Sequence, residues 1–265
     1  MITKIESSSN PIFKNTKKLL TSRDRRKNRL FVTEGLRSVS DAILHKAPIE
    51  YIIVNESYIG SLFDESYTVY RFSDKLFDEV SSTVNPQGIM AVVRFVDKDL
   101  SSLKELSPNR VVYLDSVMDP GNMGTILRTC DAMGIDAVVL SKGCVDIYNP
   151  KVVRSTMASI FNVPVYFDTD DHEALNFLCD KKMTVAGTFV DASVPCYEAD
   201  IKDNTVIVMG NEANGISNEV ASKCNTRITI PMQGGAESLN VAVCCAMVLY
   251  EQMRQNTKTG GAKNV

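Results

Sequence analysis

The sequence has little histidine and no tryptophan, and among its 265 residues only His45 and His172 carry an imidazole. Imidazole is the commonest metal ligand and the usual base of a catalytic triad, so metal or triad chemistry has little to work with. The seven cysteines form no C-x-x-C pair, and several lie inside apolar runs. We therefore predict reduced, buried thiols in a cytoplasmic protein, without a disulfide framework or a metal site.

Long hydrophobic runs are also missing. Residues 1–20 are polar and basic, which is unlike a secretory signal peptide. The longest apolar run, 239–250, is too short to span a bilayer and is followed by charged and polar residues. We expect no membrane partner, and we expect this run to form a buried helix.

Two familiar nucleotide-binding motifs are absent. The sequence contains neither G-x-G-x-x-G nor G-x-x-x-x-G-K-[ST], so a Rossmann enzyme and a P-loop enzyme are both poor fits. What is present is the composition of an ordinary globular protein, with 44% hydrophobic and 23% charged residues. The length is enough for one large domain or two ordinary ones.

Positive charge is concentrated at one end of the chain. Residues 1–37 contain ten Lys or Arg and three acidic residues, which gives a net charge of +7. The whole chain carries −3, so the other 228 residues carry −10. A basic segment on an acidic body indicates a phosphate-rich partner, although a solvated basic helix gives the same pattern.

Strands alternate with helices along the chain, which predicts an α/β fold. In the first part we expect helices at 11–20, 35–46 and 74–80, a basic loop at 23–29, and strands at 30–33, 51–54, 67–72 and 88–96. The predicted organisation is an N-terminal domain at 1–97, a polar linker at 98–109, a C-terminal domain at 110–257 and a loose tail at 258–265.

The C-terminal series contains short, continuously apolar strands rich in β-branched residues, such as VVYL, AVVL and TVIVM. This pattern is typical of a parallel sheet that helices cover on both faces. We expect strands at 110–114, 137–140, 163–167, 184–189, 205–209 and 227–230. Helices are expected at 124–133, 150–161, 172–180 and 217–224, with the last and longest inside 236–255.

Three loops rich in glycine and small polar residues each follow one of these strands, at 115–128, 209–216 and 230–240. Ligands of an open parallel sheet bind in the loops at the carboxyl ends of its strands, so the three loops are candidates for one site. Each loop taken alone has an ordinary explanation as a tight turn or a helix cap. In the first loop, Arg128 follows a helix N-terminus, which suits a cation that holds phosphate or a reacting oxygen.

In this order, the three loops resemble the three motifs of the SpoU/TrmH family of SPOUT methyltransferases. The first resembles N-x-G-x-x-x-R-T at Asn122, Gly124, Arg128 and Thr129, and the second resembles G-x-E-x-x-G at Gly210, Glu212 and Gly215. The third resembles I-P-M-x-G and S-L-N-V at 230–234 and 238–241, and the stretch 149–165 also looks like the family. The residues at 31–43 and 86–93 are similar to the substrate-binding domain often found ahead of this catalytic domain.

The resemblance implies a C-terminal parallel-sheet SPOUT domain with a trefoil knot and a smaller N-terminal α/β domain of ribosomal-protein-like fold. Knots are otherwise nearly absent from proteins, so composition does not indicate one. The resemblance also implies a homodimer with its active site near the interface, RNA as partner, S-adenosyl-L-methionine as cofactor, and no metal.

The implied reaction is methyl transfer to a ribose 2′-hydroxyl of RNA. The implied catalytic residues are Asn122, Arg128, Glu212, Ser238 and Asn240, and the implied cofactor-binding residues are Thr188, Gly210, Ile230, Met232 and Leu239. Arg128 would contact the hydroxyl and the adjacent phosphate, Ser238 and Asn240 would orient the hydroxyl or Arg128, and the other two would order the site. Arg128 would act as general base or, because a guanidinium stays protonated, by lowering the pKa of the hydroxyl.

The basic N-terminal segment agrees with an RNA partner, since Lys and Arg that neutralise phosphates supply most non-specific affinity. The predicted RNA-binding residues are Lys14, Lys17, Lys18, Arg23, Arg25, Arg26, Lys27, Arg29 and Arg154. The separate N-terminal domain favours ribosomal RNA over transfer RNA. The alternatives are a SPOUT base methyltransferase, a catalytically silent RNA-binding or ribosome-assembly protein, and a small-molecule α/β enzyme, which would leave the basic segment unexplained.

Overall fold

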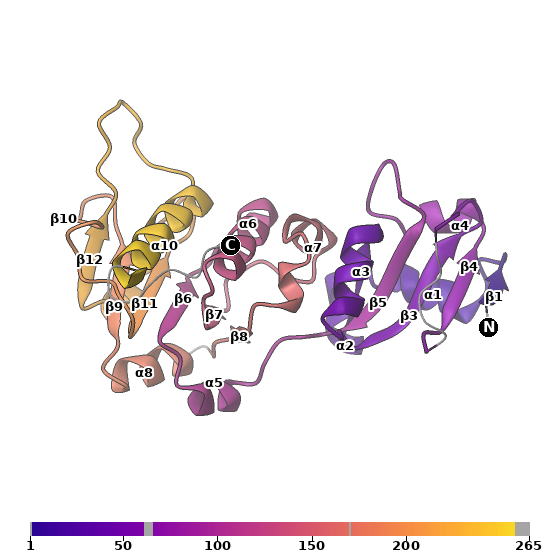
Figure 1. The fold of residues 1–265 in the computed structure, drawn as a ribbon, viewed down its shortest axis with the longest axis horizontal. Helices are drawn as coiled ribbons and strands as arrows, with labels where there is room; N and C mark the ends of the chain where they lie inside the picture. The colour runs from indigo at the N-terminus through magenta and orange to yellow at the C-terminus, as the bar shows by residue number, and fades with distance from the viewer. Residues whose placement is uncertain (1, 61–65, 170, 258–265) are drawn as a thin grey trace. The chain divides into compact units, whose positions relative to one another are not determined.

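The computed structural model describes residues 2–60, 66–169 and 171–257. The chain forms two units with separate cores, one made of residues 1–96 and 146–162, the other of residues 97–145 and the chain from 163 onward (Figure 1). Nothing in the sequence pattern indicates that 146–162 packs with the N-terminal unit. The domain boundaries drawn from the sequence stay a prediction, and the expected tail at 258–265 lies outside the described residues.

The N-terminal unit is built on a five-stranded sheet with the order β1-β4-β3-β5-β2. Its strands are β1 (Ile2–Ile5), β2 (Leu30–Glu34), β3 (Ile49–Asn55), β4 (Val69–Phe72) and β5 (Ile89–Arg94). β1 and β3 run parallel to β4, whereas β5 runs antiparallel to both β2 and β3. The strand pattern of the sequence is recovered, with β1 as an addition.

Two helices bury aromatic side chains on one face of this sheet. α1 (Pro11–Lys18) contributes Phe13 and α4 (Asp74–Asp78) contributes Phe77 to a core that also holds Phe72. α1 begins where it does because the side chain of Asn10 accepts a hydrogen bond from the N–H of Ile12 at 2.8 Å. α3 (Leu36–Leu44) contacts β2 and β5.

The expected basic loop at 23–29 is wrong, because these residues form the helix α2 (Ser22–Asn28). Thr21 caps this helix by accepting a hydrogen bond from the N–H of Asp24. Arg25 anchors it, since this side chain is only 2% exposed and its guanidinium donates to Asp146 Oδ2 at 2.7 Å. Because the segment carries many charges, the sequence does not reveal that Arg25 faces the interior.

The expected helix at 150–161 is also divided in two. α7 (Pro150–Ser155) ends where Met157 and Ala158 adopt left-handed backbone conformations, and a 3-10 turn, η1 (Ser159–Phe161), follows. Ahead of α7, the ring of Tyr148 stacks on that of Phe95 with centroids 3.8 Å apart. This stacking fastens the segment 146–162 to the N-terminal unit.

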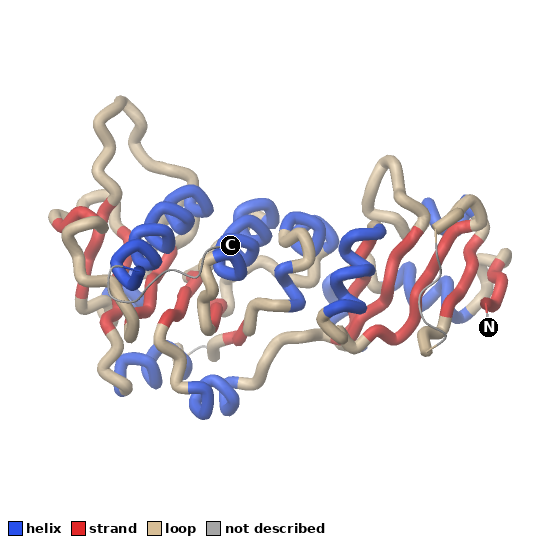
Figure 2. The backbone as a smooth tube through the Cα atoms, viewed as in Figure 1, coloured by secondary structure: helices blue, strands red, loops and turns tan. Residues whose placement is uncertain are grey.

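The C-terminal unit contains a seven-stranded sheet with the order β10-β12-β9-β11-β6-β7-β8, in which every pairing is parallel. Strands are drawn in red in Figure 2. Its strands are β6 (Arg110–Leu114), β7 (Ala137–Leu140), β8 (Val165–Phe167), β9 (Thr184–Thr188), β10 (Val194–Pro195), β11 (Thr205–Met209) and β12 (Thr226–Thr229). The predicted α/β class with a parallel sheet is confirmed. The trefoil knot stays a prediction.

Helices cover this sheet from two sides. α5 (Leu100–Leu106), α8 (Glu173–Asp180) and α9 (Asn218–Ala221) share one core with the strands. α6 (Pro120–Ala132) and α10 (Val241–Thr257) pack against each other (Figure 1). Among the described residues, no helix has the length and apolar character needed to cross a membrane. The cytoplasmic location stays a prediction.

Candidate functional site

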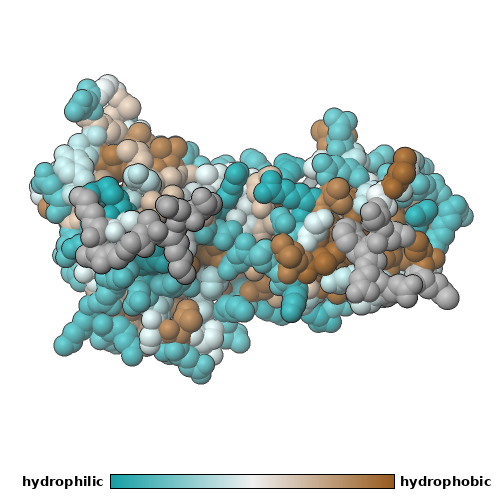
Figure 3. Space-filling view, viewed as in Figure 1, coloured by the Kyte–Doolittle hydropathy of each residue, from teal (hydrophilic) through white to brown (hydrophobic). Residues whose placement is uncertain are grey.

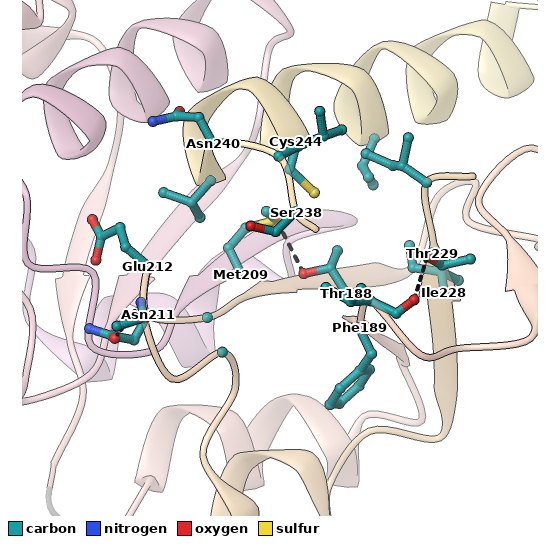
Figure 4. Close-up of a pocket in the computed structure, with 18 residues that line it drawn as sticks. Thr188, Phe189, Met209, Asn211, Glu212, Ile228, Thr229, Ser238, Asn240 and Cys244 are labelled. Carbon is teal, nitrogen blue, oxygen red and sulfur yellow. Dashed lines mark hydrogen bonds between the residues drawn. The ribbon is translucent and has the colours of Figure 1, made fainter. Parts of the chain in front are cut away.

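A cavity of about 360 Å³ lies at the carboxyl ends of β9, β11 and β12, beside the first turns of α10 (Figure 4). The loops that follow β11 and β12 both contribute to its wall, through Gly210 and Glu212 from the first and Ser238 and Asn240 from the second. The second and third loops singled out in the sequence therefore meet at one place. This position agrees with the rule that ligands bind at the carboxyl ends of parallel strands.

Four of the five predicted cofactor-binding residues line this cavity. They are Thr188, Gly210, Ile230 and Leu239. Met232 is not among the lining residues and belongs to the loop that projects between β12 and α10 in Figure 1. The role of all five residues stays a prediction, but four of them line one cavity.

Gly210 lies where the chain turns back after β11. A Cβ atom at this position would overlap the carbonyl carbon of Gly215 and the amide nitrogen of Ile216. The turn is closed by two backbone hydrogen bonds between Asn211 and Gly215, each 2.9 Å long. Because two backbone segments approach this closely, only glycine fits, and the peptide groups of the turn form part of the cavity wall.

A chain of hydrogen bonds joins all three loops. The carboxylate of Glu212 accepts hydrogen bonds from the backbone N–H groups of Met118 at 3.2 Å and Asp119 at 3.0 Å. It also accepts one from the side-chain amide of Asn122 at 3.0 Å. The Oδ1 atom of Asn122 in turn accepts a hydrogen bond from the side chain of Asn240 at 2.9 Å. The first loop is thereby held against the two loops that form the cavity wall.

Two members of this region also cap helices. Asp119 Oδ1 accepts the N–H of Asn122 at 2.8 Å, so α6 begins at Pro120, earlier than the expected residue 124. Asn240 Oδ1 accepts the N–H of Ala242 at 2.9 Å, so α10 begins at 241, inside the expected range 236–255. Asn240 therefore caps α10 through Oδ1, and its Nδ2 atom donates to Asn122.

The carboxylate of Glu212 is held in its charged form. Burial raises its pKa, but the hydrogen bonds from Asn122 and from the backbone of Asp119 and Met118 outweigh burial, so the pKa lies below its ordinary value. Each of these partners is an N–H donor, which an ionised acceptor satisfies best. This arrangement suits a residue that orders the site.

We expect Glu212→Gln to lower the free energy of unfolding by roughly 0.5 kcal/mol near neutral pH, because an amide group donates at one position where the carboxylate accepts, and solvent screens the exposed carboxylate. Since the folded pKa is lowered, this stabilisation is present above the ordinary value of 4.5 and is lost as the pH falls through the folded value. Denaturant unfolding at neutral and acidic pH measures the effect. The gap between wild type and variant should close in acid, and a gap that stays constant would contradict the assignment.

Two predicted catalytic side chains take no part in the hydrogen-bonded chain. Ser238 lines the cavity, and its hydroxyl has no hydrogen-bond partner among the described residues. Arg128 lies about two turns into α6, is exposed, and has no partner within 2–60, 66–169 and 171–257. It is also not among the residues that line the cavity. The structure thus brings four predicted catalytic residues together and leaves Arg128 apart.

Sequence reasoning missed two residues that support the loops. Asp115 is 3% exposed, and its Oδ2 atom accepts the N–H of Ser217 at 2.7 Å. The side chain of Asn211 donates to the carbonyl of Ser116 at 2.8 Å. A lone carboxylate directly after a continuous apolar strand was a usable signal for Asp115. Asn211 has no such signal, because asparagine is ordinary in turns.

A cysteine also lines the cavity. Burial raises the pKa of the Cys244 thiol to about 12. The thiol is therefore protonated at neutral pH, and the thiolate is the form of cysteine that attacks electrophiles. Cys244 contributes shape to the cavity, not a nucleophile.

The basic residues of the N-terminal unit divide into two groups. Lys14, Lys17, Lys18, Arg23, Arg26, Lys27 and Arg29 are exposed on α1, on α2 or at the end of α2. Arg154 is exposed on α7, where it donates to the carbonyl of Ser82 at 3.1 Å. Arg25 is different, because it is buried and paired with Asp146. The expectation that Arg25 contacts RNA is corrected, since its charge holds the fold together.

Comparison with known proteins agrees with this architecture. Residues 109–250 match the SpoU rRNA Methylase family, and residues 10–91 match an MRM3-like substrate binding domain. The 23S rRNA (guanosine(2553)-2′-O)-methyltransferase RlmP of Bacillus subtilis (strain 168) is 34% identical over 93% of this chain and 97% of its own length. A 23S rRNA (uridine(2479)-2′-O)-methyltransferase of Streptomyces viridochromogenes is 27% identical over 94% of this chain and 91% of its own.

Solved structures resemble the chain over almost its full length. The SpoU methyltransferase AviRb from Streptomyces viridochromogenes, in complex with the cofactor AdoMet, superimposes with a TM-score of 0.85 at 26% identity, covering 96% of this chain and 100% of its own. An AdoMet-bound rRNA methyltransferase from Sinorhizobium meliloti gives 0.83 at 28% identity, covering 96% and 98%. The resemblance drawn from the three loops is confirmed, and the chain belongs to the SpoU rRNA methylase family.

Proposed function

We propose that this protein transfers the methyl group of S-adenosyl-L-methionine to a ribose 2′-hydroxyl of ribosomal RNA. The observation that carries the proposal is the hydrogen-bonded chain from Glu212 through Asn122 to Asn240, which joins three loops at one cavity. The Bacillus subtilis relative is a 23S rRNA 2′-O-methyltransferase, and the Streptomyces structure holds AdoMet. Both align with nearly all of this chain, which supports assigning the same reaction and cofactor to it.

The cavity fits a cofactor of this kind. Its volume of about 360 Å³ lies within the usual range for small-molecule sites. The backbone of Gly210 lines the cavity, and Ile230 and Leu239 add apolar surface. The bound cofactor supplies an electrophilic methyl group. Thr188, whose hydroxyl is tied to the carbonyl of Val208 at 3.0 Å, fixes the end of β9 beside it.

The protein must then orient a weak nucleophile and help it lose a proton. Ser238, whose hydroxyl has no partner among the described residues, is placed to hydrogen-bond the ribose at the cavity. The guanidinium of Arg128 grips the neighbouring phosphate and lowers the pKa of the ribose hydroxyl, and phosphate or water takes the proton. Glu212 and Asn122 contribute by holding the loops in place. Correct positioning of the reacting groups can remove much of the activation barrier of such a transfer.

We also propose that the active protein is a homodimer. The exposed face of α10 carries Val243, Met247 and Tyr250, which are 50%, 46% and 56% exposed and lie at the spacing of a helical stripe. Figure 3 shows hydrophobic side chains gathered where α10 begins, beside the base of the projecting loop. An exposed apolar stripe indicates an interface. Because α6 packs beside α10, the same interface carries Arg128 toward the cavity of the other protomer.

Met247→Glu is expected to dissociate the dimer, because a buried charge without a partner strongly opposes association. Light scattering after size exclusion should then give half the wild-type mass, with methyl transfer lost and cofactor affinity retained. Leu106→Glu is the matched control, since Leu106 is 48% exposed on α5 and should tolerate a charge. A Met247→Glu protein that remains dimeric and active would contradict this interface.

The N-terminal unit supplies RNA contacts in this proposal. Its match to a substrate binding domain covers α1 and α2, which carry the exposed Lys and Arg residues. Phosphate neutralisation by these side chains gives affinity without sequence preference. A ribosomal RNA substrate also agrees with the predicted cytoplasmic location.

Labelled methyl transfer from S-adenosyl-L-methionine to RNA of a strain that lacks this protein tests the reaction. A 2′-O-methylnucleoside confined to ribosomal RNA supports the proposal. A methylated base would keep the family and overturn the ribose chemistry. No transfer to naked RNA or to ribosomal particles, with cofactor still bound, would favour an RNA-binding protein without catalysis.

A further inference from the structure

A second cavity, of about 160 Å³, lies in the N-terminal unit and takes no part in the methyl-transfer proposal. Its apolar surface comes from Leu19, Leu30 and Tyr51. Leu19 is 2% exposed, whereas Leu30 and Tyr51 are half-buried. The cavity therefore has an apolar floor in a part of the chain that otherwise carries many charges.

The ring of Tyr51 is fixed in place. Its hydroxyl lies 3.1 Å from Thr16 Oγ1, and its ring packs edge-on against Tyr70 with centroids 5.4 Å apart. A rigid aromatic beside two leucines is a surface on which a planar ring packs well. A cavity of about 150 Å³ holds a benzene-sized ring, so this one holds a single heterocyclic base and nothing much larger.

The polar rim of the cavity keeps unused hydrogen-bonding groups. Asn15 is exposed on α1, and its amide has no partner among the described residues. Asn28 donates through Nδ2 to the carbonyl of Asp24 at 2.8 Å, which keeps its Oδ1 as an acceptor. Asp24 Oδ2 accepts a hydrogen bond from the hydroxyl of Thr21 at 3.0 Å, which leaves Oδ1 available as an acceptor. One amide and several acceptors thus surround an apolar floor, as the edge of a nucleobase requires.

Two lysines, Lys18 from α1 and Lys27 from α2, complete the rim. Both are exposed. A phosphate inside the cavity would meet the carboxylate of Asp24, whereas a base inside it would place its flanking phosphates outside, near the lysines. The charge arrangement therefore favours a base within the cavity and phosphates at its mouth.

We infer that this cavity binds one unstacked nucleobase of the substrate RNA, with Lys18 and Lys27 on the phosphates beside it. The inference rests on the proposed function, because it assumes an RNA substrate. It adds a base-reading site to a surface that otherwise supplies only charge. Sequence-specific RNA recognition generally uses unpaired bases that stack on aromatic side chains and hydrogen-bond through their edges.

Binding of short RNAs to the full chain tests the site. The probes are nine-residue ribose-phosphate oligomers that are abasic except for a single central A, C, G or U, with a fully abasic oligomer as reference. The wild-type protein should bind its preferred base about tenfold more tightly than the reference, which lies within the range that one stacked base contributes to affinity. Asn15→Phe, whose ring would fill the cavity, should bind all five oligomers within about twofold of one another.

Three lysine variants and a second occluding variant separate the cavity from charge alone. Lys18→Gln and Lys27→Gln should weaken every oligomer and lower the slope of affinity against salt by about 0.7 each. Lys14→Gln, on the exposed side of α1 and outside the cavity, should weaken binding and leave the base preference intact. Asn15→Leu gives a smaller occluding side chain, and it keeps the test decisive if Asn15→Phe folds poorly.

Equal binding of all five oligomers by the wild-type protein, or no binding at all, would overturn the inference. A free mononucleotide that binds as tightly as its oligomer would also overturn it, because the ligand would then be a metabolite and not RNA. Methyl transfer to ribosomal RNA is measured in parallel. Methyl transfer to ribosomal RNA without a base preference in oligomer binding would refute this site and leave the proposed function standing. A base preference without methyl transfer would support this site and contradict the proposed function.

Discussion

Arg128→Ala is expected to reduce the rate of methyl transfer by about 10³-fold while cofactor affinity stays within about twofold of wild type. The structure separates these two effects, because Arg128 lies outside the cavity that Thr188, Gly210 and Leu239 line. The side chain is exposed on α6 and has no partner among the described residues, so its loss leaves no buried group unsatisfied. Single-turnover transfer and titration of the cofactor measure the two quantities independently.

The control removes a cation elsewhere in the same unit. Lys104 is exposed on α5 and makes one ion pair with Glu173, so Lys104→Ala should leave the rate unchanged. Arg128→Lys should not restore it, because lysine lacks the planar fork that holds a phosphate at two points. If Arg128→Ala lost cofactor binding and catalysis together, Arg128 would have a structural role and not a catalytic one.

Mixed dimers test whether Arg128 acts across the interface. Arg128→Ala has an intact cavity, whereas Cys244→Phe keeps Arg128 and places a ring in the cavity. If Arg128 serves the partner's cavity, half of the freely mixed dimers contain one complete site of two, and about a quarter of wild-type activity returns. If Arg128 serves its own cavity, the mixture stays inactive.

Local patterns in the sequence predicted the strands well. VVYL, AVVL and TVIVM became β6, β7 and β11, because a strand buried on both faces needs continuous apolar residues whatever surrounds it. The three loops were recognisable for a related reason, since glycine and small polar residues at strand ends are tied to backbone geometry. Gly210 shows this directly, because no other residue fits beside Gly215.

Contacts between distant residues were not predictable in the same way. The segment 23–29 was expected to be a loop because it is highly charged, yet it is helical since Arg25 pairs with Asp146, 121 residues away. No local sequence pattern predicts a partner so far away in the chain. The hydrogen bonds that link Glu212, Asn122 and Asn240 are similar. The first joins residues 90 positions apart in the sequence, and the second joins residues 118 positions apart. Sequence identified its members, but only the fold shows that they touch.

Gly210→Ala is expected to abolish cofactor binding, with affinity reduced by at least about 100-fold, and to destabilise the C-terminal unit by about 3 kcal/mol. A methyl group here would overlap the backbone of Gly215 and Ile216, and backbone cannot move aside as a flexible side chain can. The turn must open, so the two hydrogen bonds between Asn211 and Gly215 are lost. Glu212 lies inside this turn, so its hydrogen bonds to the first loop are disturbed as well.

Calorimetry of cofactor binding and thermal unfolding measure these two losses. Gly235→Ala is the matched control for stability, because a Cβ at Gly235 meets nothing within 4 Å and the substitution should leave the unfolding temperature unchanged. Gly210→Ser should behave like Gly210→Ala or worse, since the clash arises at the Cβ that both share. A Gly210→Ala protein that binds cofactor normally would mean that the close approach of these two backbone segments is not needed for the site. The cavity, and with it the assignment of Gly210 to the cofactor, would then have to be abandoned.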